Sequence, residues 1–181
     1  MDLLTALLAS ANATDLEQLG SQFNLDKSSL DSVLNQVVPA LGRGIQNNTR
    51  ASGGLESLVD ALQTGGHERY LNDLSEVTSL SGIADGNNIL GHVFGSKDVS
   101  RNVAAHASQN SGVSPDIIKQ MLPMIATMVM GAISKQTADG AQAAHAGSGD
   151  LGSMLSSVLD SDGDGSPVDD ILDMAKRIMR P

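Results

Sequence analysis

The chain has 181 residues, a formal net charge of -10 at pH 7 and a pI of about 4.5. This negative charge repels a phosphate backbone and disfavours nucleic-acid binding, because basic residues cluster only at Lys176, Arg177 and Arg180. There is no cysteine, which excludes disulfides, thiolate catalysis and thiolate zinc sites.

The cellular location of the protein is predicted from its apolar segments. The first ten residues, MDLLTALLAS, are apolar but carry Asp2 where a secretion signal would carry Lys or Arg. The longest unbroken apolar run, residues 121–133, is shorter than the roughly 20 residues needed to cross a bilayer. We therefore expect a cytoplasmic protein without membrane insertion.

Apolar residues recur at helical spacing along the first half of the chain, and no stretch alternates at period two. Aromatic residues are only 2% of the total, so the core must be built from aliphatic side chains, which suit helices. The first predicted helix has a capping box of Thr14 and Glu17, and the second begins at Asp26 and is kinked or broken at Pro39. Two further helices are predicted over residues 53–66 and 67–77.

The middle of the chain predicts three more helices. Residues 85–112 indicate a short helix, a stop at Gly95 and a longer Ala-rich helix. Ser114 then caps a helix that has Pro115 in its first turn and is apolar nearly all round to about residue 134. Such a helix lies at the centre of a bundle. We expect its methionines to fill the core and not to form an exposed groove or oligomer interface: Met121, Met124, Met128 and Met130.

Two segments have related patterns. Residues 25–41 and 113–128 each begin with a capping residue, and each reaches a proline within an apolar stretch. The fold class predicted from these patterns is all-α, a multi-helical bundle of two similar helical units plus a C-terminal helical hairpin. We expect a helical core domain over residues 1–136, a flexible linker over 137–149, and a helix-loop-helix tail over 150–181.

One segment carries a family resemblance. Residues 86–133 contain GHVFG, SGVSPD and MLPMIA followed by VMGAI, in an order and spacing that resemble the YidB-like family, a bacterial domain family of unknown function. The resemblance extends over most of residues 1–136. It implies an all-helical fold in bacterial cells, and it brings no established activity and no catalytic residues.

The chain shows no recognisable active site. His67, His92, His106 and His145 lack the spacing of three or four residues that places two imidazoles on one helix face. We interpret His92 as a hydrogen-bonded structural residue near a helix end flanked by glycines. There is no nucleophile elbow, phosphate-binding loop or dinucleotide fingerprint. We therefore expect no enzyme, no catalytic or cofactor-binding residues, and no small-molecule substrate.

An acidic loop in the tail predicts a candidate calcium site. Its first half, DSDGDG, matches the oxygen ligands and the glycine of an EF-hand loop, although Ile171 at position 12 cannot be a ligand. A carboxylate at position 10 would close a shortened loop similar to the calcium loops of bacterial extracellular proteins. The candidate metal ligands are therefore Asp160, Asp162, Asp164 and Asp169.

The second half of this loop also has an explanation that needs no cation. Ser166 would cap the last helix, Pro167 would occupy its first turn, and Asp169 would act as an acidic partner of the cap. Both interpretations stay open. From the sequence we expect a non-enzymatic bacterial helical protein that acts by self-association or by binding another protein. The alternative is a calcium-responsive binding module that uses the Asp160–Asp169 loop.

Overall fold

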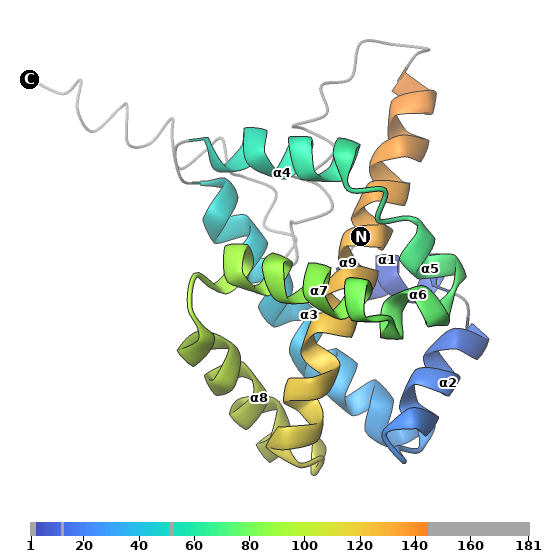
Figure 1. The fold of residues 1–181 in the computed structure, drawn as a ribbon, viewed down its shortest axis with the longest axis vertical. Helices are drawn as coiled ribbons and strands as arrows, with labels where there is room; N and C mark the ends of the chain where they lie inside the picture. The colour runs from blue at the N-terminus through green and yellow to red at the C-terminus, as the bar shows by residue number, and fades with distance from the viewer. Residues whose placement is uncertain (1–2, 12, 51–52, 145–181) are drawn as a thin grey trace, which may run out of the picture.

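The computed structural model describes residues 3–11, 13–50 and 53–144, and in these ranges every regular element is a helix. The predicted all-α bundle is confirmed (Figure 1). The tail hairpin predicted for residues 150–181 lies outside the described residues. In chain order the helices are α1 (Leu3–Ser10), α2 (Ala13–Gln22), α3 (Lys27–Thr49), α4 (Gly54–Thr64), α5 (Arg69–Asn72), α6 (Leu74–Thr78), α7 (Leu80–Phe94), α8 (Lys97–Ser111) and α9 (Pro115–Ala144).

Helix α9 runs through the bundle and contacts seven of the other described helices, α1 and α3 to α8. All of residues 121–134 are buried, as the apolar pattern predicts. The four methionines fill the core, with at most 8% of any of them exposed. The hydroxyl of Thr127, in the middle of this stretch, donates to the carbonyl of Met124 at 2.8 Å, whereas the buried hydroxyl of Ser134 at its end has no hydrogen-bond partner among the described residues.

The start of α9 agrees with the prediction, and its end does not. The start is confirmed, since the backbone N–H of Ile117 donates to the hydroxyl of Ser114 and Pro115 is the first helical residue. At the other end the helix continues to Ala144, so the first part of the linker predicted for residues 137–149 is helical. Alanine, glutamine and lysine favour helix, and each residue added to an existing helix gains a hydrogen bond without new nucleation. Residues 145–149 lie outside the described ranges.

Helix α3 begins as predicted but does not break at its proline. The Asp26 side chain accepts from the backbone N–H of Ser29 at 2.7 Å and caps the helix. The helix then passes through Pro39 and ends at Thr49. Its buried stripe continues on both sides of the proline, and this packing offsets the one lost hydrogen bond. The stripe consists of Leu30, Val33, Leu34, Val37, Val38, Leu41 and Ile45.

Three other local predictions differ from the structure. Thr14 lies inside α2, which begins at Ala13, so it is not the predicted cap. Residues 67–77 form two short helices instead of one, because Asp73 ends α5 and its side chain caps α6 by accepting from the N–H of Ser75 at 2.8 Å. Helix α7 begins at Leu80, five residues before the predicted segment, and it stops as predicted at Gly95, which has a φ of +69°.

A close contact between two long helices joins α7 to α9. A Cβ atom at Gly86 would lie 2.1 Å from the carbonyl oxygen of Pro123 and 2.7 Å from its Cα atom. The two backbones are therefore in direct contact, which only glycine permits at this position. The predicted similarity of two helical units stays a prediction, although α3 and α9 are both capped helices with an internal proline and they contact each other.

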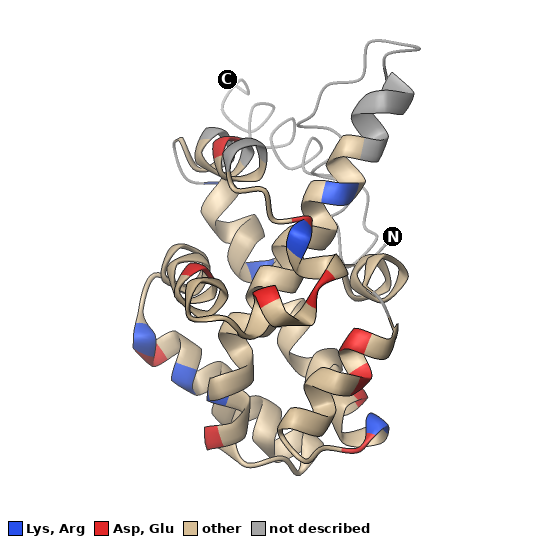
Figure 2. Ribbon diagram, turned by 45° about the vertical axis from the view of Figure 1, so that its right-hand side comes forward, with Lys and Arg blue, Asp and Glu red and all other residues tan. Residues whose placement is uncertain are grey.

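Charged residues lie on the outer helices and towards the ends of the long ones, and the buried middle of α9 carries none (Figure 2). By length and composition, one segment among the described helices could cross a membrane, residues 115–138 of α9. It is longer than the uninterrupted apolar run of residues 121–133 that the sequence shows. In the structure 83% of an 18-residue apolar window of this segment is buried inside the protein, as in the core helix of a folded domain.

The contact at Gly86 predicts a matched pair of variants on one helix. Gly86→Ala should lower the free energy of unfolding by about 1–3 kcal/mol, because its Cβ would overlap backbone that cannot move cheaply. Gly91→Ala is the control, since a Cβ at Gly91 meets nothing within 4 Å. That variant should be neutral or up to about 1 kcal/mol more stable. Urea unfolding of both measures the difference, and equal stabilities would contradict the contact.

Candidate functional site

A half-open pocket lies between the second half of α3, α4, the end of α7 and the middle of α9. Its volume is about 240 Å³. Most of its wall is apolar, and the described residues that line it include no Asp, Glu, Lys or Arg. Mostly apolar concave sites with a few polar groups are typical of ligand pockets. The lining residues are Ile45, Asn48, Thr49, Gly54, Ser57, Leu58, Ala61, His67, Ile89, His92, Val93 and Met130.

Two contacts between α3 and α7 hold one side of this pocket. Gly44 lies against the end of α7, where a Cβ would be 2.4 Å from Cγ1 of Val93 and 2.9 Å from its carbonyl oxygen. One helical turn further, Nδ2 of Asn48 donates to the carbonyl of His92 at 2.5 Å. This bond satisfies a carbonyl in the last turn of α7 that has no partner within the helix. The pocket wall is therefore tied together at a helix end.

His67 contributes to this wall a buried ring nitrogen that has no hydrogen-bond partner among the described residues. It is only 8% exposed, and its Nδ1 has no hydrogen-bond partner among the described residues. Burial lowers the pKa of His67, the nearby Asp85 carboxylate opposes this shift and Arg69 adds to it. Since the ordinary pKa is 6.5, the buried imidazole is neutral at pH 7.

The half-buried Asn48 and Thr49 and the exposed Ser57, which also line the described wall, are already bonded. Asn48 donates to His92, Thr49 donates to the carbonyl of Gln46 at 2.9 Å, and Ser57 donates to the carbonyl of Gly53 at 2.8 Å. The ring of His92 is exposed to solvent. Nδ1 of His67 is consequently the atom in this wall whose hydrogen bond is missing, which costs free energy in a buried place.

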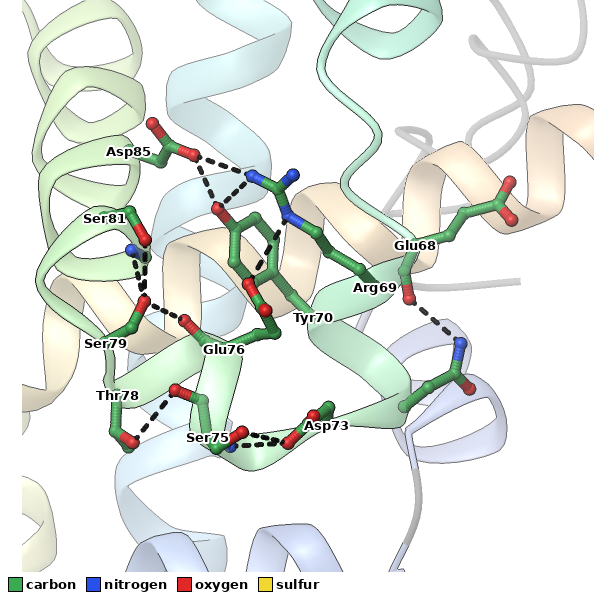
Figure 3. A network of polar contacts seen from close by, with 12 residues as sticks. Glu68, Arg69, Tyr70, Asp73, Ser75, Glu76, Thr78, Ser79, Ser81 and Asp85 are labelled. Atoms are coloured by element: carbon green, nitrogen blue, oxygen red, sulfur yellow. Dashed lines mark hydrogen bonds and ion pairs between the residues drawn. The ribbon is translucent and has the colours of Figure 1, made fainter.

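A polar network lies beside His67, on the short helices that follow it (Figure 3). The hydroxyl of Tyr70, a residue only 1% exposed, donates to Oδ2 of Asp85 on α7 at 2.5 Å. Nη2 of Arg69 donates to the Tyr70 oxygen at 2.8 Å and to Oδ2 of Asp85 at 3.3 Å. Its guanidinium carbon lies 4.8 Å from the centre of the Tyr70 ring. The network satisfies a buried phenol and joins α5 to α7.

Helix caps and a close backbone contact determine where His67 and the short helices after it lie. Ser79 ends α6 and caps α7, because its hydroxyl donates to the carbonyl of Glu76 at 2.7 Å and accepts from the N–H of Gly82 at 2.9 Å (Figure 3). On the other side, a Cβ at Gly131 of α9 would lie 2.7 Å from the carbonyl oxygen of His67. His67 is thus held directly against the central helix.

A second, more open groove of about 530 Å³ lies between α7, α8 and α9 and is lined by Lys97, Arg101 and Lys119, among others. Arg101 bonds Asp98 at 2.8 Å, and Lys119 bonds Asp116 at 3.0 Å. All of these charges are exposed, so the pairs contribute little, and the groove contains no buried side chain without a partner. It is the weaker candidate.

The structure brings together none of the residues that the sequence singled out as metal ligands. Asp160, Asp162, Asp164 and Asp169 lie outside the described residues, as does His145. Within the described part of the chain no group of three or more His, Cys, Asp or Glu is arranged to hold a metal ion. His92 lines the pocket, and it is its backbone carbonyl, not its ring, that accepts a hydrogen bond.

Sequence reasoning missed His67. Residues 67–77 carry several acidic side chains, which made the segment look like a solvated face. The burial of His67 comes from its contact with Gly131, which is 64 residues away in the chain, and a single sequence contains no sign of that contact. The local signals are the glycine pair 65–66 before it and the tyrosine three residues after it, and neither indicates a pocket.

Comparison with known proteins gives one match. Residues 5–136, more than half of the chain, match a family described as "Bacterial protein of unknown function (DUF937)". The resemblance to the YidB-like family is consistent with this match. No curated protein and no solved structure matches the chain.

The network predicts how Tyr70 titrates. Burial raises the pKa of Tyr70 above its ordinary value of 10.0, the bond to Asp85 raises it further, and the bond from Arg69 lowers it. Tyr70 is the chain's one tyrosine and there is no tryptophan, so tyrosinate absorbance reports this residue alone. The midpoint should be higher in the native protein than in urea. Asp85→Asn should lower the native midpoint, and Arg69→Gln should raise it.

The control for this titration is Asp98→Asn, a carboxylate on α8 outside the network, which should leave the midpoint unchanged. Because the folded-state pKa is raised, the tyrosine stabilises the fold below the unfolded pKa, and this contribution is lost as pH rises through the folded-state value. Equal midpoints in native and unfolded protein would contradict the network.

Proposed function

Since the chain belongs to the DUF937 family of bacterial proteins, whose function is unknown, we propose that it is a non-enzymatic cytoplasmic protein that acts by self-association. In this proposal the helical core is a folded platform, and the tail, residues 150–181, binds the core of another copy. The observation that carries the proposal is that α9 continues beyond residue 134, where its complete burial ends.

Helix α9 continues past residue 134, where its complete burial ends. Burial is complete over residues 121–134, Lys135 is exposed, and residues 136–138 are half-buried. The helix then continues to Ala144, and its last turns extend beyond α4 (Figure 1). The ten residues from Lys135 to Ala144 span about 15 Å at the usual helical rise. This rigid extension carries the chain away from the core before the tail begins.

The sequence of the tail needs an apolar surface. Its predicted helices are short, and isolated helices of that length are marginal in water. Only residues 145–149 separate Ala144 from the tail, and five or six residues reach at most about 20 Å. In this proposal the tail buries its apolar positions against the core of a second copy. The apolar positions at helical spacing are Leu151, Met154, Leu155, Val158, Leu159, Val168, Ile171, Leu172, Ala175, Ile178 and Met179.

The burial of α9 supports the cytoplasmic part of the proposal. In the segment long enough to cross a bilayer, 83% of an 18-residue apolar window is covered by the other helices of the bundle, including α3 and α7. If α9 were placed in lipid, these helices would lose the core that they pack against. Acidic outer faces would also be repelled by anionic lipid.

Light scattering coupled to size-exclusion chromatography tests self-association. The full chain should have a mass above that of one copy, and a chain ending at residue 144 should have the mass of a monomer. Leu155→Asp should act like the truncation, because it places a charge in the apolar stripe of the tail. The control is Ser156→Asp, which adds the same charge beside the stripe and should keep the larger mass. Equal masses of the full and shortened chains would refute the proposal.

The alternative is a calcium-responsive tail, favoured by the three alternating aspartates that helix capping does not explain. Calcium would relieve the repulsion among Asp160, Asp162 and Asp164, with Asp169 closing the loop. Isothermal titration of the full chain should show calcium binding that is lost in Asp160→Ala and in Asp169→Asn. Asp170→Asn, one residue further, should retain it. An absence of heat at millimolar calcium would end this alternative.

A further inference from the structure

The groove between α7, α8 and α9 supports an inference that rests on the proposed self-association and names the surface at which the tail binds. The described residues that line it include Lys97, Arg101 and Lys119 and no Asp or Glu. The chain has 21 Asp and Glu against 11 Lys and Arg, and three of these basic residues are in the tail. Three of the other basic residues therefore gather in one groove, which makes it a local positive region on an acidic protein.

The charges of this groove are available to a partner. Lys97 forms none of the ion pairs between described residues. Arg101 and Lys119 each pair with a carboxylate on their own helix, but these pairs are exposed to solvent and therefore weak. A guanidinium has five N–H donors and an ammonium group has three, so both side chains keep donors for a second carboxylate.

The form of the groove suits a segment of protein better than a small molecule. It is open, and the leucines that line it, Leu90 and Leu122, are buried. Gly91 also lines it, and a Cβ there would meet nothing within 4 Å, so this wall leaves free space beside the helix. Val99, one of the few large apolar side chains exposed among the described residues, lies in the first turn of α8. An acidic segment flanked by apolar residues fits such a surface.

The tail contains a segment of this kind. Residues 160–170 include five aspartates and no Lys or Arg. Leu159 and Val168 supply apolar side chains next to these charges. The acidic excess of the protein repels such a segment from most of its surface, whereas the groove attracts it.

The length of the chain places this segment on a second copy. The groove lies at the start of α9, at the bottom of Figure 1, whereas the tail follows the other end of α9 at the top. From Lys119 to Ala144 the helix is about 37 Å long at the usual rise. Residues 145–150 reach at most about 20 Å, and the predicted helix before Asp160 adds about 14 Å. Even a path straight back along α9 would end short of Lys119 of the same copy.

We propose that the acidic segment, residues 160–170, binds in the basic groove of a second copy. Its aspartates form ion pairs with the three basic residues of the groove, and the apolar residues beside them pack near Val99. Calcium at this loop would occupy the same carboxylates, so the binding is measured in the presence of a chelator.

Three substitutions at Gly91 test the groove in the full chain, and the free space there should let each variant fold. Gly91→Lys adds a positive charge, Gly91→Glu adds a negative charge, and Gly91→Gln measures the effect of size alone. Sedimentation equilibrium in EDTA gives the dissociation constant of the assembly. Gly91→Lys should associate about tenfold more tightly than Gly91→Glu, with Gly91→Gln between them, because the segment that binds is acidic.

Lys27→Glu is the control for net charge. Lys27 is an exposed residue of α3 that pairs with Asp31 on its own helix and lies outside the groove. The change alters the net charge by as much as separates Gly91→Lys from Gly91→Glu, and it should leave the dissociation constant unchanged. Equal constants for these two Gly91 variants would overturn the inference and leave self-association standing. A full chain that stays monomeric would refute both.

A second series identifies the segment that occupies the groove. When Asp160, Asp162 and Asp164 are all changed to Asn, the assembly should be weaker, and Gly91→Lys and Gly91→Glu should then differ by about threefold or less. A difference of unchanged size would mean that another segment occupies the groove, and it would overturn the assignment. Binding in the groove of the same copy predicts the opposite order, since Gly91→Lys would then hold the tail back from the assembly, and this result would also overturn the proposal.

Discussion

At Gly86 the backbone of α7 touches the backbone of α9, so closely that a Cβ atom would lie 2.1 Å from the carbonyl oxygen of Pro123. The positions of the polar network around Tyr70 and of the pocket depend on this crossing. Helix α7 carries Asp85, the acceptor for Tyr70, one residue before the contact, and it carries Ile89 and Val93 of the pocket in the turns that follow. A wider crossing would move all three side chains relative to the short helices α5 and α6.

Close crossings also explain how a chain with so few aromatic residues fills its interior. Glycines let backbones approach closely at several places, among them Gly86 against α9, Gly44 against α7 and Gly131 against His67, just before α5. Aliphatic side chains and methionines then fill the narrow spaces between the helices. Methionine suits this role because it is flexible and unbranched. The one tyrosine, Tyr70, is buried where Arg69 and Asp85 satisfy its hydroxyl group.

The pocket and the tail give this chain two independent surfaces. The pocket lies within the segment that matches the family, whereas the acidic loop and the apolar positions of the tail follow residue 136, where the match ends. A role for the pocket can therefore extend to the helical core of the family. The proposed self-association through the tail, and the alternative of calcium binding by its loop, both rest on residues that follow the family match.

The sequence by itself determined the all-α class, the burial of residues 121–134 and the helix ends at Asp26, Gly95 and Ser114, because these follow from local periodicity, capping and glycine geometry. It did not show that α3 passes through Pro39, since buried residues on both sides of the proline hold that helix together. Nor did it show His67 in a pocket wall. Only the tertiary structure decided that, because His67 contacts Gly131, and because the pocket brings α3 and α4 together with α7 and α9, which lie much later in the chain.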